Sequence, residues 1–334
     1  MLKIRRHFAW AITALMLLSS SVFADEKTAA PSSETAPEEN PLLITTDHGL
    51  TFIGIVLAHK ALRNSKAYHN WPFLAFAMPA AWNSAVNFQK DINKLVTFKG
   101  TTGGAFSFAG LNLSAEANLE LIHLLEFGIQ GTLGSAFNYG DAATFMGVFD
   151  PEERDYSQDV FMTEFTYGVK YKASLTIPLM IFLPKSDWTK IILKPNASLT
   201  YNAYTGAEDG EVWKAGAENS VNGFKYSYGG VLIYILPFER VPMAMVSANV
   251  SGFKHAYDFD KAYKDYDPGF VSVSITPMLS IKIAEKWNSM LMASFTRDRL
   301  YEKYRYEPTE EILQKRIGSE WNAKTIIWTF TRKF

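Results

Sequence analysis

The chain of 334 residues contains no cysteine. It therefore has no disulfide, no thiolate ligand for a metal and no cysteine to carry a lipid. Neither sign of charge dominates, because 33 Lys and Arg residues stand against 34 Asp and Glu residues. Proteins that bind nucleic acid carry a strongly basic patch. This charge balance argues against nucleic acid as a partner, and we expect no cofactor.

Long hydrophobic runs are also scarce. Hydrophobic residues make up 48% of the chain, yet its mean hydropathy is only −0.05. A bundle of membrane helices would have a far higher value, whereas a membrane barrel alternates apolar and polar residues. The apolar run at residues 8–18 is shorter than the ~20 residues that a spanning helix needs.

That run belongs to a pattern typical of an export signal. Lys3, Arg5 and Arg6 precede it, and Val22-Phe23-Ala24 follows it. A basic start, a short apolar stretch and small residues at the cleavage site define a secretory signal peptide. We predict a signal peptide at residues 1–24, cleaved after Ala24. An uncleaved membrane anchor is the alternative.

Residues 25–41 have a different composition. They carry three prolines and five carboxylates and contain no large apolar side chain. Such a segment cannot bury enough apolar surface to offset the entropy cost of ordering. We predict a disordered leader here.

The rest of the chain is dominated by a period of two. At residues 109–121, apolar side chains such as Leu111, Leu113 and Leu119 alternate with polar ones such as Glu116 and Glu120. This alternation predicts a β-strand with one polar face. The longest alternating run, at residues 161–183, predicts a strand that projects well beyond the membrane. In the strand predicted at residues 270–284, Pro277 suggests a bulge. Nine strands are predicted in this way, at residues 109–121, 125–137, 161–183, 193–204, 224–236, 243–254, 270–284, 289–304 and 320–334.

Connection lengths alternate along the chain. Short turns are predicted at residues 122–124, 184–190, 238–240 and 286–287. Longer loops are predicted at residues 139–159, 206–222, 258–267 and 302–319. Short turns on one side and long loops on the other are typical of transmembrane β-barrels. A β-sandwich gives no reason for this alternation.

The last strand carries Trp328, Phe330 and Phe334 on one face. With the export signal and the alternating strands, this aromatic end resembles Gram-negative outer-membrane β-barrels of the porin-like superfamily. The resemblance implies an antiparallel barrel at residues 42–334, in contact with outer-membrane lipid. It also implies that Trp328, Phe330 and Phe334 form an insertion signal for the barrel-insertion machinery. Residues 25–41 would then lie in the periplasm.

Residues 42–103 are harder to interpret. Residues 52–56 and 71–78 are compatible with strands, whereas residues 58–63 and 81–95 look helical. Bacterial single-chain barrels have even strand numbers, so this region must add one or three strands. We favour twelve strands in total over ten. A helix that plugs the barrel is the alternative use of this region.

Polar parity in the strands predicts which charges face the lumen. Opposite charges there either pair and rigidify the barrel or line a constricted pore that selects small solutes. We therefore predict a narrow passive channel or a structural surface barrel, and leave its oligomeric state open. The candidate lumen charges are Glu116, Glu120, Glu126, Glu164, Lys170, Lys172, Lys194 and Lys282.

One loop offers an alternative function. Residues 254–267 place His255 among Asp258, Asp260, Asp265 and Asp267. Outer-membrane proteases of the omptin type use a His–Asp pair and an acidic pair at the rim to activate water. The alternative is therefore an outer-membrane hydrolase with a rim site in this loop. An ordinary solvated acidic loop explains the same residues, and our prediction is that the protein is not an enzyme.

Overall fold

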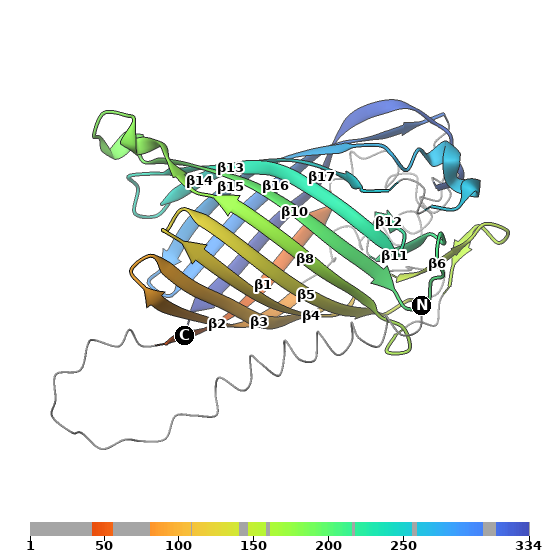
Figure 1. The fold of residues 1–334 in the computed structure, drawn as a ribbon, viewed down its shortest axis with the longest axis horizontal. Coiled ribbons are helices and arrows are strands. Elements are labelled where there is room, and N and C mark those ends of the chain that lie inside the picture. The colour runs from red at the N-terminus through yellow and green to blue at the C-terminus, as the bar shows by residue number, and fades with distance from the viewer. Residues whose placement is uncertain are drawn as a thin grey trace, which may run out of the picture.

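The computed structural model describes residues 42–55, 81–107, 109–139, 146–157, 161–215, 218–255, 259–302 and 312–333. Within these residues, twelve long antiparallel strands form one sheet that closes on itself, because β13 pairs with both β10 and β14. Figure 1 shows the resulting barrel. Its strands are β1 Leu43–Ile55, β2 Ala81–Asn93, β3 Val96–Ser107, β4 Gly110–Leu121, β5 Leu125–Ala136, β8 Thr166–Leu175, β10 Ile191–Tyr204, β13 Gly223–Ile235, β14 Met243–Phe253, β15 Ser272–Ala284, β16 Trp287–Tyr301 and β17 Arg316–Lys333.

The prediction of an antiparallel twelve-stranded barrel is confirmed. The three additional strands are β1, β2 and β3. The helical interpretation of residues 81–95 is wrong, because residues 81–93 form β2. Alternation explains the strand: Asn83 and Asn87 make polar contacts on one face, while Phe88 packs against Phe98 on the other. The expectations for residues 58–63 and 71–78 lie outside the described residues.

Two predicted details of the strands are also wrong. The run at residues 161–183 does not form one long projecting strand, because β8 ends at Leu175. The short β9 (Ile177–Pro178) and the 3-10 turns η2 (Leu179–Ile181) and η3 (Asp187–Thr189) follow it. Proline cannot donate a ladder hydrogen bond, so Pro178 fits the point at which β9 ends and η2 begins. Pro277 pairs with Val246 without a register shift, and the β15–β16 irregularity lies between Lys282 and Ala284 instead.

The two ends of the barrel differ. At one end, which we call the short-turn end, residues 94–95, 122–124, 176–190, 236–242 and 285–286 connect the strands. The other end, which we call the long-loop end, carries the connections at residues 137–165, 205–222, 254–271 and 302–315, with a two-residue exception at 108–109. The predicted alternation therefore holds for most connections. Among the described residues, no helix is long and apolar enough to span a membrane.

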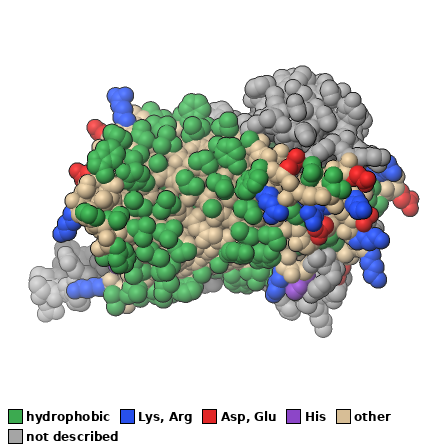
Figure 2. Space-filling model, turned by 90° about the horizontal axis from the view of Figure 1, so that it is seen from above, with side chains coloured by type: hydrophobic (Ala, Val, Ile, Leu, Met, Phe, Trp, Pro, Cys, Tyr) green, Lys and Arg blue, Asp and Glu red, His purple; other side chains and the backbone are tan. Residues whose placement is uncertain are grey.

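Large apolar side chains cover the outside of the barrel. Trp82, Phe127, Leu232 and Trp328 are among those that are roughly half exposed. Figure 2 shows hydrophobic side chains spread over the visible barrel wall, with charged side chains gathered toward its ends. A surface of this kind suits hydrocarbon rather than water.

A separate hydrophobic core lies at the long-loop end. The strands β6 (Met146–Asp150), β7 (Asp155–Tyr156), β11 (Trp213–Ala215) and β12 (Glu218–Ser220) form a second sheet there. The 3-10 helix η5 (Lys261–Tyr266) contributes two tyrosines. Figure 1 shows β6, β11 and β12 beyond that end of the barrel. We call this unit the cap; its main buried cluster is Phe149, Tyr156, Val212, Val221, Phe259, Tyr263, Tyr266, Tyr301 and Ile312.

Candidate lumen site

The inward face of the barrel follows from side-chain exposure. On β4, Leu113 and Leu119 are 36% and 38% exposed and therefore face outward. Successive side chains in a strand point to opposite faces, so Glu116 and Glu120 face the lumen. Pairing between neighbouring strands carries this assignment around the barrel. The same reasoning places seven charged side chains of β3, β4, β5, β8 and β10 inside the barrel. We call them the charged wall: Lys99, Glu116, Glu120, Glu126, Lys170, Lys172 and Lys194.

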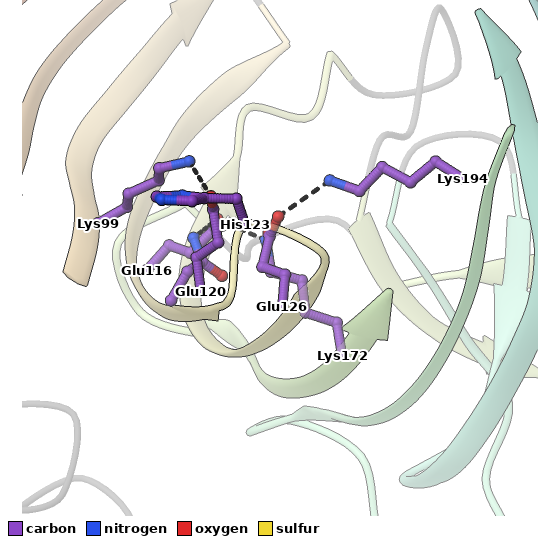
Figure 3. Close-up of polar contacts among 8 residues, drawn as sticks. Lys99, Glu116, Glu120, His123, Glu126, Lys172 and Lys194 are labelled. Atoms are coloured by element: carbon purple, nitrogen blue, oxygen red, sulfur yellow. Dashed lines mark hydrogen bonds and ion pairs between the residues drawn. The ribbon is translucent and has the colours of Figure 1, made fainter. Parts of the chain in front are cut away.

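Each glutamate of the charged wall contacts a lysine from another strand. Figure 3 shows these side chains pointing toward one another. Lys172 on β8 donates to Glu116 on β4, and Lys99 on β3 donates to Glu120. The third pair joins Lys194 Nζ on β10 to Glu126 Oε2 on β5 at 2.9 Å. These pairs tie together five neighbouring strands around one side of the lumen.

Further polar contacts surround these pairs. Glu116 also accepts a hydrogen bond from the Asn118 amide at 2.6 Å. Glu120 lies 3.1 Å from Nδ1 of His123, a residue of the turn with a positive φ of 56°. Lys170 on β8 is a further ammonium that acts on Glu116 at longer range than Lys172 does. Asp91 on β2 accepts from the Thr97 hydroxyl at 2.7 Å.

The other predicted lumen charges lie apart from this group. Glu164 precedes β8 at the long-loop end, where it accepts a hydrogen bond from the Tyr204 hydroxyl. Lys282 lies 3.9 Å from Glu239, which is on an exposed turn. Lys324 on β17 contacts Asp298 on β16 at 3.2 Å, a pair that the sequence analysis did not single out.

Sequence reasoning also missed Lys99 and His123. Lys99 lies in the region 42–103, where the sequence pattern is ambiguous between strand and helix. Its neighbours Thr97 and Thr101 share its parity, and this alternation with Phe98 and Gly100 is the signal that could have revealed it. His123 lies in a turn, where no periodicity indicates the direction of a side chain.

The loop at residues 254–267 does not assemble a hydrolase site. Asp267 Oδ2 accepts from Arg316 Nε at 2.7 Å, and its carbonyl accepts from Arg299. Tyr263 and Tyr266 are buried in the cap. Asp258 lies outside the described residues. Among the described residues, no group of three His, Asp or Glu side chains is arranged to hold a metal ion. The hydrolase alternative therefore has no support.

Two of the three residues of the predicted insertion signal lie in the described part of β17. The rings of Trp328 and Phe330 lie 4.8 Å apart, and Trp328 Nε1 donates to Ser289 Oγ at 2.7 Å. Phe334 lies outside the described residues, as do the predicted signal peptide and leader at residues 1–41.

Comparison with known proteins gives only structural likenesses. A scan of protein-family models finds no match, and neither does a search of curated proteins. The translocator domain of the autotransporter NalP from Neisseria meningitidis shares 8% identity at a TM-score of 0.35, over 98% of this chain and 96% of that one. The β domain of the Bordetella autotransporter Brka shares 8% sequence identity at a TM-score of 0.39, over 87% of this chain and 98% of that one. An outer-membrane channel from Pseudomonas putida F1 shares 9% sequence identity at a TM-score of 0.38, over 92% of this chain and 100% of that one. The barrel is established by this chain's own closed strand order.

Proposed function

We propose that this protein is an integral barrel of the bacterial outer membrane that passes small solutes passively through a narrow lumen. The charged wall inside a closed barrel is the observation that carries the proposal. Buried opposite charges that pair only with one another rigidify a protein, whereas pairs that line a lumen also present charge to a passing solute.

The exterior supports the membrane setting. An unbroken antiparallel sheet leaves no edge, so every long strand finds its backbone partners within the barrel. The exposed apolar side chains named above face the side where lipid would lie. On this proposal, outer-membrane lipid is the surrounding partner and the barrel-insertion machinery assembles the protein. Export would follow the signal peptide at residues 1–24.

Planar-bilayer recording of the purified protein tests the proposal. We expect discrete conductance steps in KCl. In a KCl gradient, replacing Glu116, Glu120 and Glu126 together by glutamine should shift the reversal potential toward anion selectivity, because their lysine partners then lack compensation. Glu239→Gln is the matched control, since Glu239 is exposed on a turn and should leave the selectivity unchanged. Absence of any conductance would contradict the channel proposal.

A structural surface barrel is the second candidate. The specific observation in its favour is the cap, whose buried aromatic cluster shows that the long loops fold into a defined unit. A surface unit of this kind suits contact with other molecules. Normal membrane insertion without conductance would favour this candidate.

A further inference from the structure

One inward-facing row of the barrel is apolar rather than polar. Its members are direct neighbours in the hydrogen-bonded register, and their outward-facing neighbours Leu232, Val246 and Ile326 are 44%, 44% and 48% exposed. Alternation therefore turns the row toward the lumen. We call it the methionine row: Ile192 on β10, Ile233 on β13, Met245 on β14, Met278 on β15, Met292 on β16 and Ile327 on β17.

The methionine row lies opposite the charged wall. The charged wall is centred on β5 and the three methionines of the row on β15, and these two strands are five strands apart one way around the barrel and seven the other way. The row meets the charged wall at β10, which carries both Ile192 and Lys194. Both groups lie within seven residues of the strand ends at the short-turn end. That half of the lumen therefore has a charged wall on one side and an apolar row on the other, with Ser280 and Lys282 following Met278 on the inward face of β15.

An apolar row on the lumen side is unfavourable in contact with water, and a plain water-filled pore has no use for it. The interior of a membrane barrel is ordinarily polar, because it is filled with water or polar residues. Methionine is flexible and polarisable, and it suits surfaces that accept varied apolar partners. The row thus matches a solute with an apolar body better than it matches a sugar or a simple ion.

The opposite wall favours a negatively charged head on that solute. Each lysine ammonium has three N–H donors. Lys99, Lys172 and Lys194 each donate one hydrogen bond to a glutamate, and Lys170 adds a fourth ammonium. Glu116 and Glu120 already accept from two partners each. The donors of this wall therefore exceed what its own carboxylates use.

A lysine ammonium also lies beside apolar side chains at the long-loop end. A cavity of about 220 Å³ is lined by Thr132, Thr166, Asn202, Trp213 and Lys225, among others. Its volume corresponds to on the order of seven water molecules, which is the size of a small organic molecule. Lys225 Nζ lies 4.7 Å from the centroid of the Phe253 ring. An ammonium and aromatic rings thus meet there too.

We propose that the lumen selects small amphipathic anions, in which an apolar body contacts the methionine row and a carboxylate faces the lysines of the charged wall. This inference rests on the proposed channel function and names its solute class. The cavity beside Trp213 and Lys225 would receive such molecules first from the long-loop side.

Current block in planar bilayers tests the inference, with octanoate as the probe. Octanoate should reduce the KCl current at far lower concentration than acetate, which lacks the apolar body, or octylammonium, which carries the opposite charge. In the triple variant Met245→Asn, Met278→Asn, Met292→Asn, the half-blocking octanoate concentration should rise roughly tenfold, which corresponds to about 1.4 kcal/mol.

The next inward row supplies the matched control. Ser247, Thr276 and Ser294 lie on the same three strands with the same facing, and the triple change to asparagine there should leave the block within about twofold of the unchanged protein. An unchanged KCl conductance shows that each variant is folded. Should the triple variant fail to fold, Met278→Asn alone replaces it, with a smaller rise expected.

Three results would overturn the inference. Equal block by octanoate and acetate, or stronger block by octylammonium, would contradict the solute class while leaving the channel function intact. Equal loss of block in the methionine-row and control variants would show that the row is not the contact. Absence of any KCl conductance would overturn the channel function and this inference together.

Discussion

Lys172 reaches Glu116 by crossing over Gly128. These residues lie on β8, β4 and β5, and Gly128 pairs with both Asn118 and Lys172. A Cβ atom added at Gly128 would stand 2.6 Å from Cε of Lys172 and closer still to Oδ1 of Asn118. The missing side chain at position 128 therefore leaves the space in which this ion pair forms.

The first prediction follows from that space. Gly128→Val should displace Lys172 and Asn118 and separate the Lys172–Glu116 pair. Overpacking of this kind costs about 1–3 kcal/mol of unfolding free energy. Urea unfolding of the protein refolded into lipid would measure it. Gly318→Ala is the control, because the nearest atom to its added Cβ is 3.6 Å away, so its stability should hardly change. A Gly128→Val barrel as stable as the control would refute the crossing.

A second prediction concerns facing on β4. Leu113 is exposed on the outer wall, and its neighbour Ser114 has the opposite parity. Arginine at a lipid-facing midplane position costs roughly 2–4 kcal/mol, whereas arginine in a hydrated lumen costs less. Leu113→Arg should therefore lower the unfolding free energy clearly more than Ser114→Arg in the same lipid assay. Equal or reversed penalties would mean that the inward and outward assignments are exchanged.

The sequence predicted the barrel better than it predicted the site. The period of two placed Glu116 and Leu113 on opposite faces of one strand, and even strand number favoured twelve. Partners were not predictable, because the register between strands comes from three-dimensional pairing: nothing local shows that Lys172 meets Glu116 across Gly128. The cap was unreadable for a different reason. Its core residues, such as Phe149 and Ile312, come from separate loops without periodicity.

Export gives the third prediction. Mass spectrometry of the protein from the outer membrane should find Asp25 at the amino terminus, because Val22-Phe23-Ala24 offers small residues at the cleavage positions. Substituting Ala24 by a bulky residue such as Trp should block this cleavage and leave the longer form. Recovery of the mature protein with residues 1–24 attached would contradict the signal peptide.

Assembly gives the fourth. The role of Trp328, Phe330 and Phe334 as an insertion signal stays a prediction. We expect that Phe334→Ala lowers the amount of protein in the outer membrane and raises the periplasmic amount, whereas Phe334→Tyr, which keeps an aromatic ring, preserves insertion. Cell fractionation with detection of the chain in each fraction measures both. Equal membrane levels for the two variants would show that the insertion machinery does not recognise the aromatic ring at position 334.

The last prediction concerns the response of the cap to alkali. Burial raises the pKa of Tyr263 from its usual 10.0 to about 12, and the nearby carboxylates of Asp260, Glu211 and Asp150 act in the same direction. A tyrosine whose pKa is higher in the folded state stabilises that state as long as it is neutral, so its contribution is complete below pH 10 and is lost as the pH rises toward 12. The near-ultraviolet circular dichroism of the cap should therefore weaken over this interval. Tyr263→Phe keeps the ring but cannot ionise, so the loss should move to higher pH, whereas Tyr139→Phe, at a side chain that is 49% exposed, should not move it. An alkaline transition that is identical in the unchanged protein and in Tyr263→Phe would show that ionisation of Tyr263 does not limit the stability of the cap.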